Sequence, residues 1–399
     1  MEAVILARSI GICWQRGALP PGFRMTDSSS PSPAFWAGRR VLVTGHSGFK
    51  GAWACRWLLE LGAEVWGASR TRGAPGGLFR RAGLAGHVTG LELELADGEA
   101  VAAAVGQARP EVVLHLGAQA IESVARRDPR ATFETNVLGL ANLLDAVRAA
   151  PETRAVTVVT TDRVYAPRPT EGVYQEEDAL GGQTPYSASK AAAELVVAAY
   201  RDLLGADGGA RVATARTSNA IGGGDDARNR LVPGLLRGAI EGHRVRIGSP
   251  DARRCWQHVA DPLRGYLRLA ERLWERADTP GSFNFGPRPE DVRTVGWVAG
   301  RLAELWGPQL DWYAAAQTPA RQADLFALNT TRARELLGWT TTMDVDAALR
   351  AVVAFARREA AGEDPGELVA EALPRSGGAA AQSTPSSAPN RGDPRPVGG

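Results

Sequence analysis

A short apolar run that leads into a glycine-rich loop constrains the fold of this 399-residue chain more than any other feature. Residues 41–43 read Val-Leu-Val, residues 44–51 read Thr-Gly-His-Ser-Gly-Phe-Lys-Gly, and a helical pattern begins near Trp53. Glycines at this spacing let the backbone turn sharply and approach a pyrophosphate, while the helix N-terminus supplies N–H donors. An ordinary tight turn is the alternative, but the flanking strand and helix favour a dinucleotide site. The predicted cofactor-binding residues are Gly45, Ser47, Gly48, Phe49 and Gly51.

Apolar runs and helical patterns alternate along the next part of the chain. Alternation at this spacing indicates βαβ units and a parallel sheet covered on both faces. The expected fold class is therefore α/β, a Rossmann-type doubly wound parallel sheet with a smaller C-terminal substrate-binding region. We expect strands at 40–44, 64–68, 112–116 and 155–160, and helices at 52–61, 131–149 and 187–204.

The same patterns divide the chain into four parts. Residues 36–218 form the expected dinucleotide-binding Rossmann domain, and residues 219–360 are mainly substrate-binding, with some segments returning to the first domain. In this second part we expect helices at 231–240, 263–276 and 292–305 and a strand at 283–285. Residues 1–35 have no periodicity and end in a Ser/Pro-rich run, which predicts a disordered leader with Met25 as an alternative start. Residues 373–399 are expected to be a disordered tail.

Charge and cysteine content exclude several classes of protein. The formal net charge is only +2, so no global electrostatic case exists for a nucleic-acid or membrane-surface partner. Cys13, Cys55 and Cys255 lie far apart, which favours neither a disulfide framework nor a metal site and suits a reducing, cytoplasmic location. No stretch is long and apolar enough to span a membrane. We therefore expect a cytoplasmic enzyme without a metal that acts on a small molecule, and we expect a homo-oligomer.

Tyr186 and Lys190 place a phenol and an ammonium on one face of a predicted helix. The ammonium and a positively charged nicotinamide ring both favour the phenolate, so Tyr186 could accept the proton of a substrate hydroxyl. Thr161, at the carboxyl end of a predicted strand, is placed to hydrogen-bond that hydroxyl. Asp162 and Arg163 follow it and form either a polar turn or part of the site.

The end of the second predicted strand bears on the choice of dinucleotide. Residues 68–72 read Ala-Ser-Arg-Thr-Arg and hold no carboxylate that could bind a ribose 2′-hydroxyl. Arg70 and Arg72 could favour NADP over NAD, and solvated loop charges are the alternative. We expect NAD and leave NADP open.

The loop at 44–51 resembles the TGHTGFKG loop of the CDP-glucose 4,6-dehydratases, a family of extended short-chain dehydrogenase/reductases. The resemblance covers about residues 35–355. Further matching segments follow in order: 115–119 (His-Leu-Gly-Ala-Gln), 178–182 (Asp-Ala-Leu-Gly-Gly), 185–190 (Pro-Tyr-Ser-Ala-Ser-Lys), 221–225 (Ile-Gly-Gly-Gly-Asp), 230–233 (Arg-Leu-Val-Pro) and 256–259 (Trp-Gln-His-Val).

The resemblance implies an internal redox cycle on a nucleotide sugar. NAD would take hydride from sugar C4, water would be lost across C5 and C6, and hydride would return to C6 to give CDP-4-dehydro-6-deoxy-glucose. Tyr186 would be the base for oxidation, with Lys190 its electrostatic partner and ribose anchor. Thr161 would orient the hydroxyl, and Asp162 would protonate the departing C6 oxygen. Asn219, Arg230 and Arg254 stand at motif positions that imply substrate binding, although for any single arginine a solvated charge is the alternative.

Arg163 departs from the family pattern, which reads Asp-Lys-Cys-Tyr where this chain has Asp-Arg-Val-Tyr at 162–165. The family lysine is assigned to deprotonation of C5. A guanidinium stays protonated, so Arg163 can stabilise an enolate oxygen but is a poor general base. Elimination is then expected to be slow unless another group supplies the base. Thr184, Asp226 and Cys255 also replace the usual Asp, Trp and Pro of the family.

Three functions remain open from the sequence. The first is a nucleotide-sugar 4,6-dehydratase. The second is a nucleotide-sugar epimerase or ketoreductase, which shares the loop and the Tyr/Lys pair and which Arg163 makes more plausible. The third is a catalytically impaired relative that only binds nucleotide sugar or NAD. The presence of Asp162, Tyr186 and Lys190 argues against the third.

Overall fold

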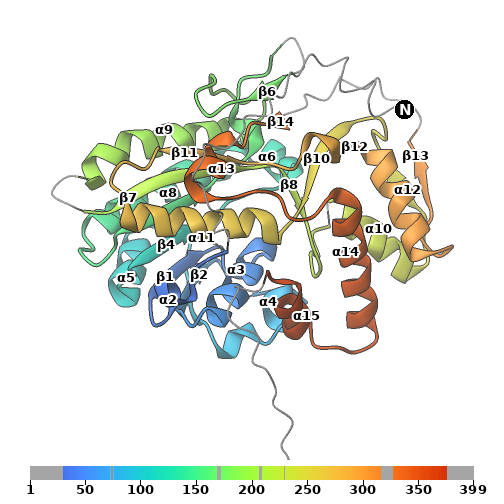
Figure 1. Cartoon of the computed structure of the whole chain (residues 1–399), viewed down its shortest axis with the longest axis horizontal. Helices are drawn as coiled ribbons and strands as arrows, with labels where there is room; N and C mark the ends of the chain where they lie inside the picture. Colours follow the sequence, from blue (N-terminus) through green and yellow to red (C-terminus); the bar gives the residue numbers. More distant parts are fainter. Residues whose placement is uncertain are drawn as a thin grey trace, which may run out of the picture.

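The computed structural model describes residues 30–71, 73–74, 76–168, 172–205, 209–228, 230–315 and 327–374. A seven-stranded sheet runs through its centre, and neighbouring strands are parallel throughout (Figure 1). The spatial order is β11-β7-β5-β4-β1-β2-β3, so the winding direction reverses between β1 and β4. The strands are β1 (Arg40–Thr44), β2 (Glu64–Ser69), β3 (Thr89–Glu92), β4 (Val112–His115), β5 (Ala155–Val159), β7 (Arg211–Thr217) and β11 (Ser282–Phe285).

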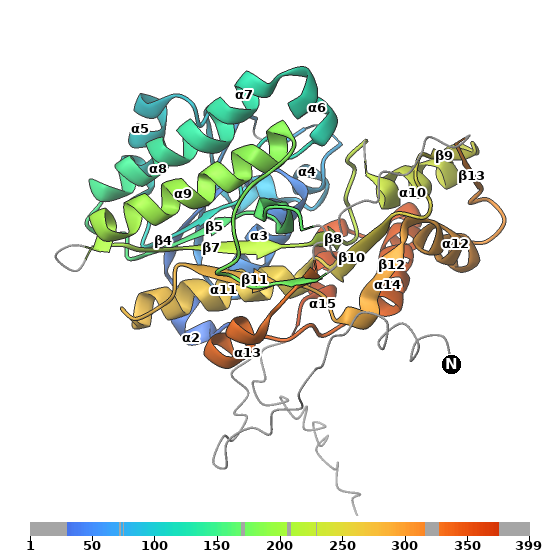
Figure 2. The same ribbon diagram turned by 90° about the horizontal axis from the view of Figure 1, so that it is seen from above.

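Helices cover both faces of this sheet (Figure 2), which explains why β4 and β5 are buried along their whole length. On one face, α3 (Phe49–Glu60) and α11 (Ala260–Glu275) form an apolar core with α2 (Pro33–Trp36), α4 (Leu78–Arg81), α13 (Thr331–Leu337) and α15 (Pro365–Ala372). On the other face, a second core joins the sheet to α5 (Gly98–Ala108), α8 (Gly139–Arg148) and α9 (Pro185–Gly205). The Rossmann-type fold predicted from the sequence is confirmed.

A smaller region lies beside the carboxyl ends of the central strands (Figure 2). Its three-stranded sheet consists of β8 (Asn219–Ile221), β10 (Arg253–His258) and β12 (Val292–Thr294). A third apolar core packs it against α10 (Leu231–Glu241), α12 (Val295–Trp306) and α14 (Val345–Ala360), with the strand pair β9 (Val245–Ile247) and β13 (Trp312–Ala314) alongside. From the same part of the chain, β11 belongs to the central sheet and α11 packs on one of its faces.

The remaining elements are short connections. The π-turn η2 (Glu134–Leu138) interrupts one long helix between α7 (Pro129–Phe133) and α8. The others are η1 (Leu84–Gly86), α6 (Glu122–Arg127), η3 (Asp162–Val164), η5 (Pro289–Asp291) and the paired strands β6 (Val173–Tyr174) and β14 (Ala327–Leu328).

Three expectations need correction. The predicted helix at 292–305 is wrong at its start, because residues 292–294 form strand β12 before α12 begins. The predicted leader is wrong for residues 30–35, because α2 begins at Pro33 and the Ser32 backbone N–H donates to Glu271 Oε1 at 2.7 Å. The predicted tail is wrong at Leu373, which is buried in the first core. The rest of both predictions, at 1–29 and 375–399, lies outside the described residues.

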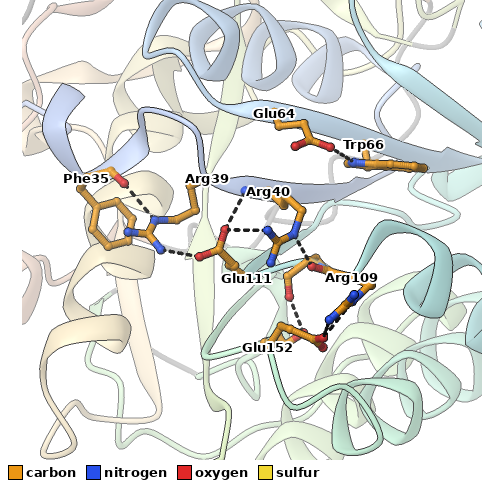
Figure 3. A network of polar contacts seen from close by, with 10 residues as sticks. Phe35, Arg39, Arg40, Glu64, Trp66, Arg109, Glu111 and Glu152 are labelled. Carbon is orange, nitrogen blue, oxygen red and sulfur yellow. Dashed lines mark hydrogen bonds and ion pairs between the residues drawn. The ribbon is translucent and has the colours of Figure 1, made fainter.

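Ion pairs gather at the amino ends of the central strands (Figure 3). Glu111, just before β4, accepts from the Arg39 side chain and from the backbone N–H of Arg40, where β1 begins. Arg109 pairs with Glu152, just before β5. Ion pairs near the surface each contribute about 0–1 kcal/mol, so their main effect is to fix the strand starts relative to one another. These ion pairs all lie at the edge of the sheet opposite the carboxyl ends of the strands.

Candidate active site

A cavity of about 1390 Å³ opens at the carboxyl ends of the central strands, where the winding reverses. This is the position at which doubly wound sheets bind ligands, and the volume exceeds the roughly 300–1,000 Å³ typical of one small ligand. All the site residues predicted from the sequence line it. They are Gly45, Ser47, Gly48, Phe49, Gly51, Thr161, Asp162, Arg163, Tyr186, Lys190, Asn219, Arg230 and Arg254.

The glycine loop connects β1 to α3 and faces this cavity. Gly45 has a φ of +71°, and a Cβ there would lie 2.8 Å from the backbone of Gly117. A Cβ at Gly51 would lie 2.1 Å from the carbonyl oxygen of Gly45, so this glycine lets α3 pack closely on the loop. At Gly48 the nearest atom would be 3.4 Å away, and no side chain caps the helix there. The free N–H groups of the first turn and the open space beside Gly48 fit a pyrophosphate.

Ser69, the last residue of β2, contacts the glycine loop. Its hydroxyl hydrogen-bonds Ser47 Oγ at 2.9 Å and His46 Nδ1 at 3.2 Å. The His46 ring is fully buried against Gly67, and burial lowers its pKa. Arg70 lines the cavity, whereas Arg72 lies outside the described residues.

Tyr186 and Lys190 lie one turn apart in α9 and both line the cavity. Burial raises the pKa of Tyr186, while its hydrogen bond with Thr161 and the charge of Arg163 act in the opposite direction. Lys190 Nζ donates to the carbonyl oxygen of Val159 at 3.0 Å. Burial lowers the pKa of Lys190 to about 8. In this arrangement the charges of Arg163 and Arg230 favour the phenolate.

Thr184 occupies the position of the family's aspartate before the catalytic helix. Its hydroxyl accepts from the backbone N–H of Ser187 at 3.2 Å, and Ser187 Oγ accepts from the N–H of Thr184 at 2.9 Å. This reciprocal arrangement caps the start of α9. The substitution therefore keeps a capping function.

Asp162 lies in the short helix η3 at the end of β5 and is 8% exposed. Its Oδ1 accepts from the Thr161 hydroxyl at 2.9 Å. Burial raises the pKa of Asp162, while Arg163, Arg254 and Lys50 oppose that rise. A carboxyl group whose pKa is raised suits the role of general acid.

Cations and one amide line the side of the cavity formed by the smaller region. Arg230, at the start of α10, pairs with Asp225 Oδ2 at 3.1 Å. Arg254 lies on β10, and Asn219 on β8 donates to the carbonyl oxygen of Cys255 at 3.4 Å. Arg230 and Arg254 are placed to neutralise an anionic ligand.

Asn136 and Lys50 were not identified as site residues from the sequence. Asn136, in the π-turn η2, accepts from the Gln119 backbone N–H at 2.8 Å and donates to Ser189 Oγ at 2.9 Å, so it fixes the loop after β4 to α9. Asn136 lies inside the predicted helix at 131–149, and nothing in that helical pattern indicates a functional role for it. Lys50 lines the cavity in the first turn of α3, and its place inside the glycine motif could have identified it.

Comparisons with known proteins agree with this geometry. The sequence pattern of the family described as NAD dependent epimerase/dehydratase family matches residues 41–286. A CDP-glucose 4,6-dehydratase from Salmonella typhimurium is 35% identical over 336 residues, which cover 83% of this chain and 94% of that protein.

Solved structures show the same fold. A UDP-glucose 4-epimerase from Thermus thermophilus in complex with NAD aligns with a TM-score of 0.68 and 25% identity, over 80% of this chain and 99% of that chain. A dTDP-glucose 4,6-dehydratase from Streptomyces venezuelae with NAD bound aligns with a TM-score of 0.68 and 23% identity, over 82% of this chain and 99% of that chain. With a glycine loop, a Tyr/Lys pair and a family match over more than half of its length, the chain belongs to the NAD-dependent epimerase/dehydratase family.

Proposed function

We propose that the protein is a nucleotide-sugar 4,6-dehydratase that converts CDP-glucose into CDP-4-dehydro-6-deoxy-glucose with a bound, recycled NAD. The observation that carries the proposal is the meeting, in one cavity, of the glycine loop, the Tyr186/Lys190 pair and the acid Asp162. The 35%-identical relative is a CDP-glucose 4,6-dehydratase matched over nearly its whole length, which supports the same reaction and nucleotide.

The residues around the glycine loop fit NAD. Gly48 leaves room for the pyrophosphate, and Lys190 is the proposed anchor for the ribose. When bound, NAD accepts hydride from C4 and returns it to C6, and its positively charged ring favours the Tyr186 phenolate. Tyr186 accepts the proton of the C4 hydroxyl, and the hydrogen-bonded Thr161 holds that hydroxyl in place.

The elimination follows from the chemistry of the ketone. A carbonyl group at C4 acidifies the C5 proton, and loss of that proton allows the C6 hydroxyl to leave. Asp162, whose pKa is raised by burial, donates the proton that turns the hydroxyl into water. Arg163 cannot accept a proton at any working pH, and its charge stabilises the enolate oxygen.

Mass spectrometry of CDP-glucose incubated with purified protein tests the proposal. We expect a product lighter than the substrate by one water, with no added cofactor consumed. UDP-glucose and dTDP-glucose serve as controls for the nucleotide. An isomer of unchanged mass would instead identify an epimerase, and recovery of unchanged substrate would identify a binding protein.

The dinucleotide can be identified independently of activity. Chromatography of the nucleotides released on denaturation is expected to show NAD. Release of NADP alone would mean that Arg70 binds a 2′-phosphate at the edge of the cavity.

We also propose a homodimer formed through α7, η2 and α9. Phe133, Leu138, Leu195 and Leu203 on these three packed elements are between 39% and 62% exposed. Exposed apolar side chains that gather on one face are typical of an interface between subunits. Sedimentation velocity should show a dimer for the wild type and a monomer for Leu195→Glu. A monomeric wild type at micromolar concentration would contradict the proposal.

Nucleotide sugars and buried reduced thiols are compatible with the cytoplasmic location expected from the sequence. Cys55 and Cys255 are both buried. Among the described residues, no helix is long and apolar enough to cross a membrane.

A further inference from the structure

The proposed elimination needs a base for C5, and Arg163 cannot be that base. C5 and C6 are adjacent carbons, so the base must lie close to Asp162, the acid that serves C6. Among the described residues, the charges of Arg163, Arg254 and Lys50 oppose the rise of the Asp162 pKa. Of these three groups only the Lys50 amine can accept a proton, because a guanidinium is a very poor base.

Two other titratable groups near Asp162 do not fit the role. Tyr186 is already assigned to the proton of the C4 hydroxyl. Burial raises the pKa of Cys255 to about 12, so its thiol holds its proton, and the residue is not among those that line the cavity.

We propose that Lys50 is the general base that removes the C5 proton in this enzyme, in the role that the family gives to a lysine at position 163. The inference rests on the proposed dehydratase function. Lys50 lines the cavity together with Asp162, and its Nζ donates to the hydroxyl of Tyr266 on α11 at 3.4 Å, which helps to hold the amine in place.

The surroundings of Lys50 favour a neutral amine. Burial lowers the pKa of Lys50 to about 7. Arg230 and Lys190 lower it as well, whereas Asp162 and Asp225 raise it. The first turn of α3 also carries the positive end of the helix dipole, which disfavours an ammonium. A large fraction of Lys50 is therefore deprotonated near neutral pH.

Lysine usage in the sequence gives independent support. The chain has 46 basic residues, and Lys50 and Lys190 are the only lysines among them. All the other basic residues are arginines, and they include Arg163, where the family has a lysine. Both retained lysines line the cavity, where an amine that can lose its proton differs chemically from a guanidinium.

The proposed step is balanced. The C5–H bond breaks, its proton moves to the neutral Nζ of Lys50, and the electron pair passes into the enolate of the C4 ketone. The enolate re-forms the ketone as the C6–O bond breaks, and the leaving hydroxyl takes a proton from Asp162 to become water. The Lys50 ammonium returns its proton to C5 when C6 is reduced, which restores the amine. Tyr186 releases the proton of the C4 hydroxyl and Asp162 takes one up through the solvent, which restores both groups.

The test separates C4 oxidation from C5 deprotonation. Lys50→Arg places a permanent cation at this position without a base, and Lys50→Met places neither a base nor a charge there. Each is mixed with CDP-glucose in D₂O, and NADH absorbance, deuterium at C5 and product are followed in a single turnover. We expect C4 oxidation in both variants and a loss of C5 exchange of at least about 100-fold. Exchange in the wild type should rise with pH through about 7, and Lys50→Arg should lack this rise.

Two further variants complete the experiment. Lys50→Ala should regain C5 exchange when small primary amines are added. Arg56→Gln removes a cation of the same helix that pairs with Glu60 and Glu367, and should leave the ratio of exchange to oxidation unchanged.

The outcomes distinguish the two proposals. If Lys50→Arg exchanges C5 within about threefold of the wild type, the residue only supplies charge and its role as base is refuted. If Lys50→Arg loses C4 oxidation as much as exchange, Lys50 binds the substrate instead, and the role is refuted again. A wild type that neither oxidises C4 nor exchanges C5 with CDP-glucose refutes the proposed function, and the role of Lys50 with it.

Discussion

Gly48 and Gly51 stand three residues apart in one loop but are required for different reasons. A Cβ at Gly51 would collide with the backbone of the loop itself, whereas a Cβ at Gly48 would have 3.4 Å of clearance within the protein. The requirement at Gly48 therefore comes from the ligand, and the requirement at Gly51 from the fold.

Alanine at these two positions gives a matched pair of variants. Gly48→Ala should fold normally and bind NAD at least about tenfold more weakly, or about 1.4 kcal/mol. Gly51→Ala should lower the free energy of unfolding of the NAD-free protein by about 1–3 kcal/mol, as expected for overpacking. Calorimetry of NAD binding and urea unfolding provide the two measurements. Full NAD content in purified Gly48→Ala would show that the loop does not hold the pyrophosphate.

Among single residues, the sequence predicts those site residues that lie in a recognisable motif or at the end of a predicted strand. Thr161, Asp162 and Tyr186 were found in this way and line one cavity. Asn136 and Glu194 were not found, because their partners lie at least 17 residues away and no periodicity indicates them. Lys50 is a different case, because the glycine motif that contains it indicates a backbone conformation and not a role for the lysine side chain.

The position of α9 depends on a buried ion pair beneath the Tyr/Lys pair. Glu194, one turn after Lys190, is 4% exposed and accepts from Arg216 at 2.8 Å, Thr214 at 2.7 Å and Thr160 at 2.5 Å. These contacts connect α9 to β7 and to the end of β5. Thr161 and Asp162 follow closely after that end of β5. The charge of Glu194 also offsets part of the lowering of the Lys190 pKa that burial causes.

Glu194→Gln should therefore weaken the packing of α9 against the sheet and destabilise the protein. Breaking one side of a buried pair leaves Arg216 uncompensated, and we expect a loss of about 3–5 kcal/mol in the free energy of unfolding. Glu134→Gln removes an exposed partner of Arg130 and should change stability by less than about 0.5 kcal/mol. Urea unfolding of both variants checks the contrast, and equal stabilities would mean that the buried pair does not hold α9 in place.

Elements with clear periodicity were predicted to within a few residues, and elements defined by long-range pairing were not. The expected helix at 187–204 is α9 (Pro185–Gly205), and the expected strand at 40–44 is β1. β7 and β10 were missed because arginines interrupt their apolar pattern. Arg216 on β7 is buried by its pairing with Glu194, which the sequence does not reveal.

For the whole molecule, the two buried lysines set the pH dependence of stability near neutral pH. Their pKa values, about 7 for Lys50 and about 8 for Lys190, lie below the ordinary value of 10.5. Between pH 7 and 8.5 the unfolded chain therefore binds more protons than the folded one, and stability rises with pH. Above about pH 9 the raised pKa values of Cys55 and Cys255 act in the opposite direction, because the folded state then keeps protons that the unfolded state loses.

The NAD-free protein should consequently gain about 2 kcal/mol of stability between pH 7 and 8.5, or a few degrees in melting temperature. Lys50→Met removes the group that titrates first, so its melting temperature should be higher at pH 7 and should depend less on pH over the same interval. Differential scanning calorimetry at four pH values, with ionic strength held constant, measures both slopes. A wild type whose stability falls from pH 7 to 8.5 would show that Lys50 keeps its proton in the folded state, and an ammonium at that position could not take a proton from C5.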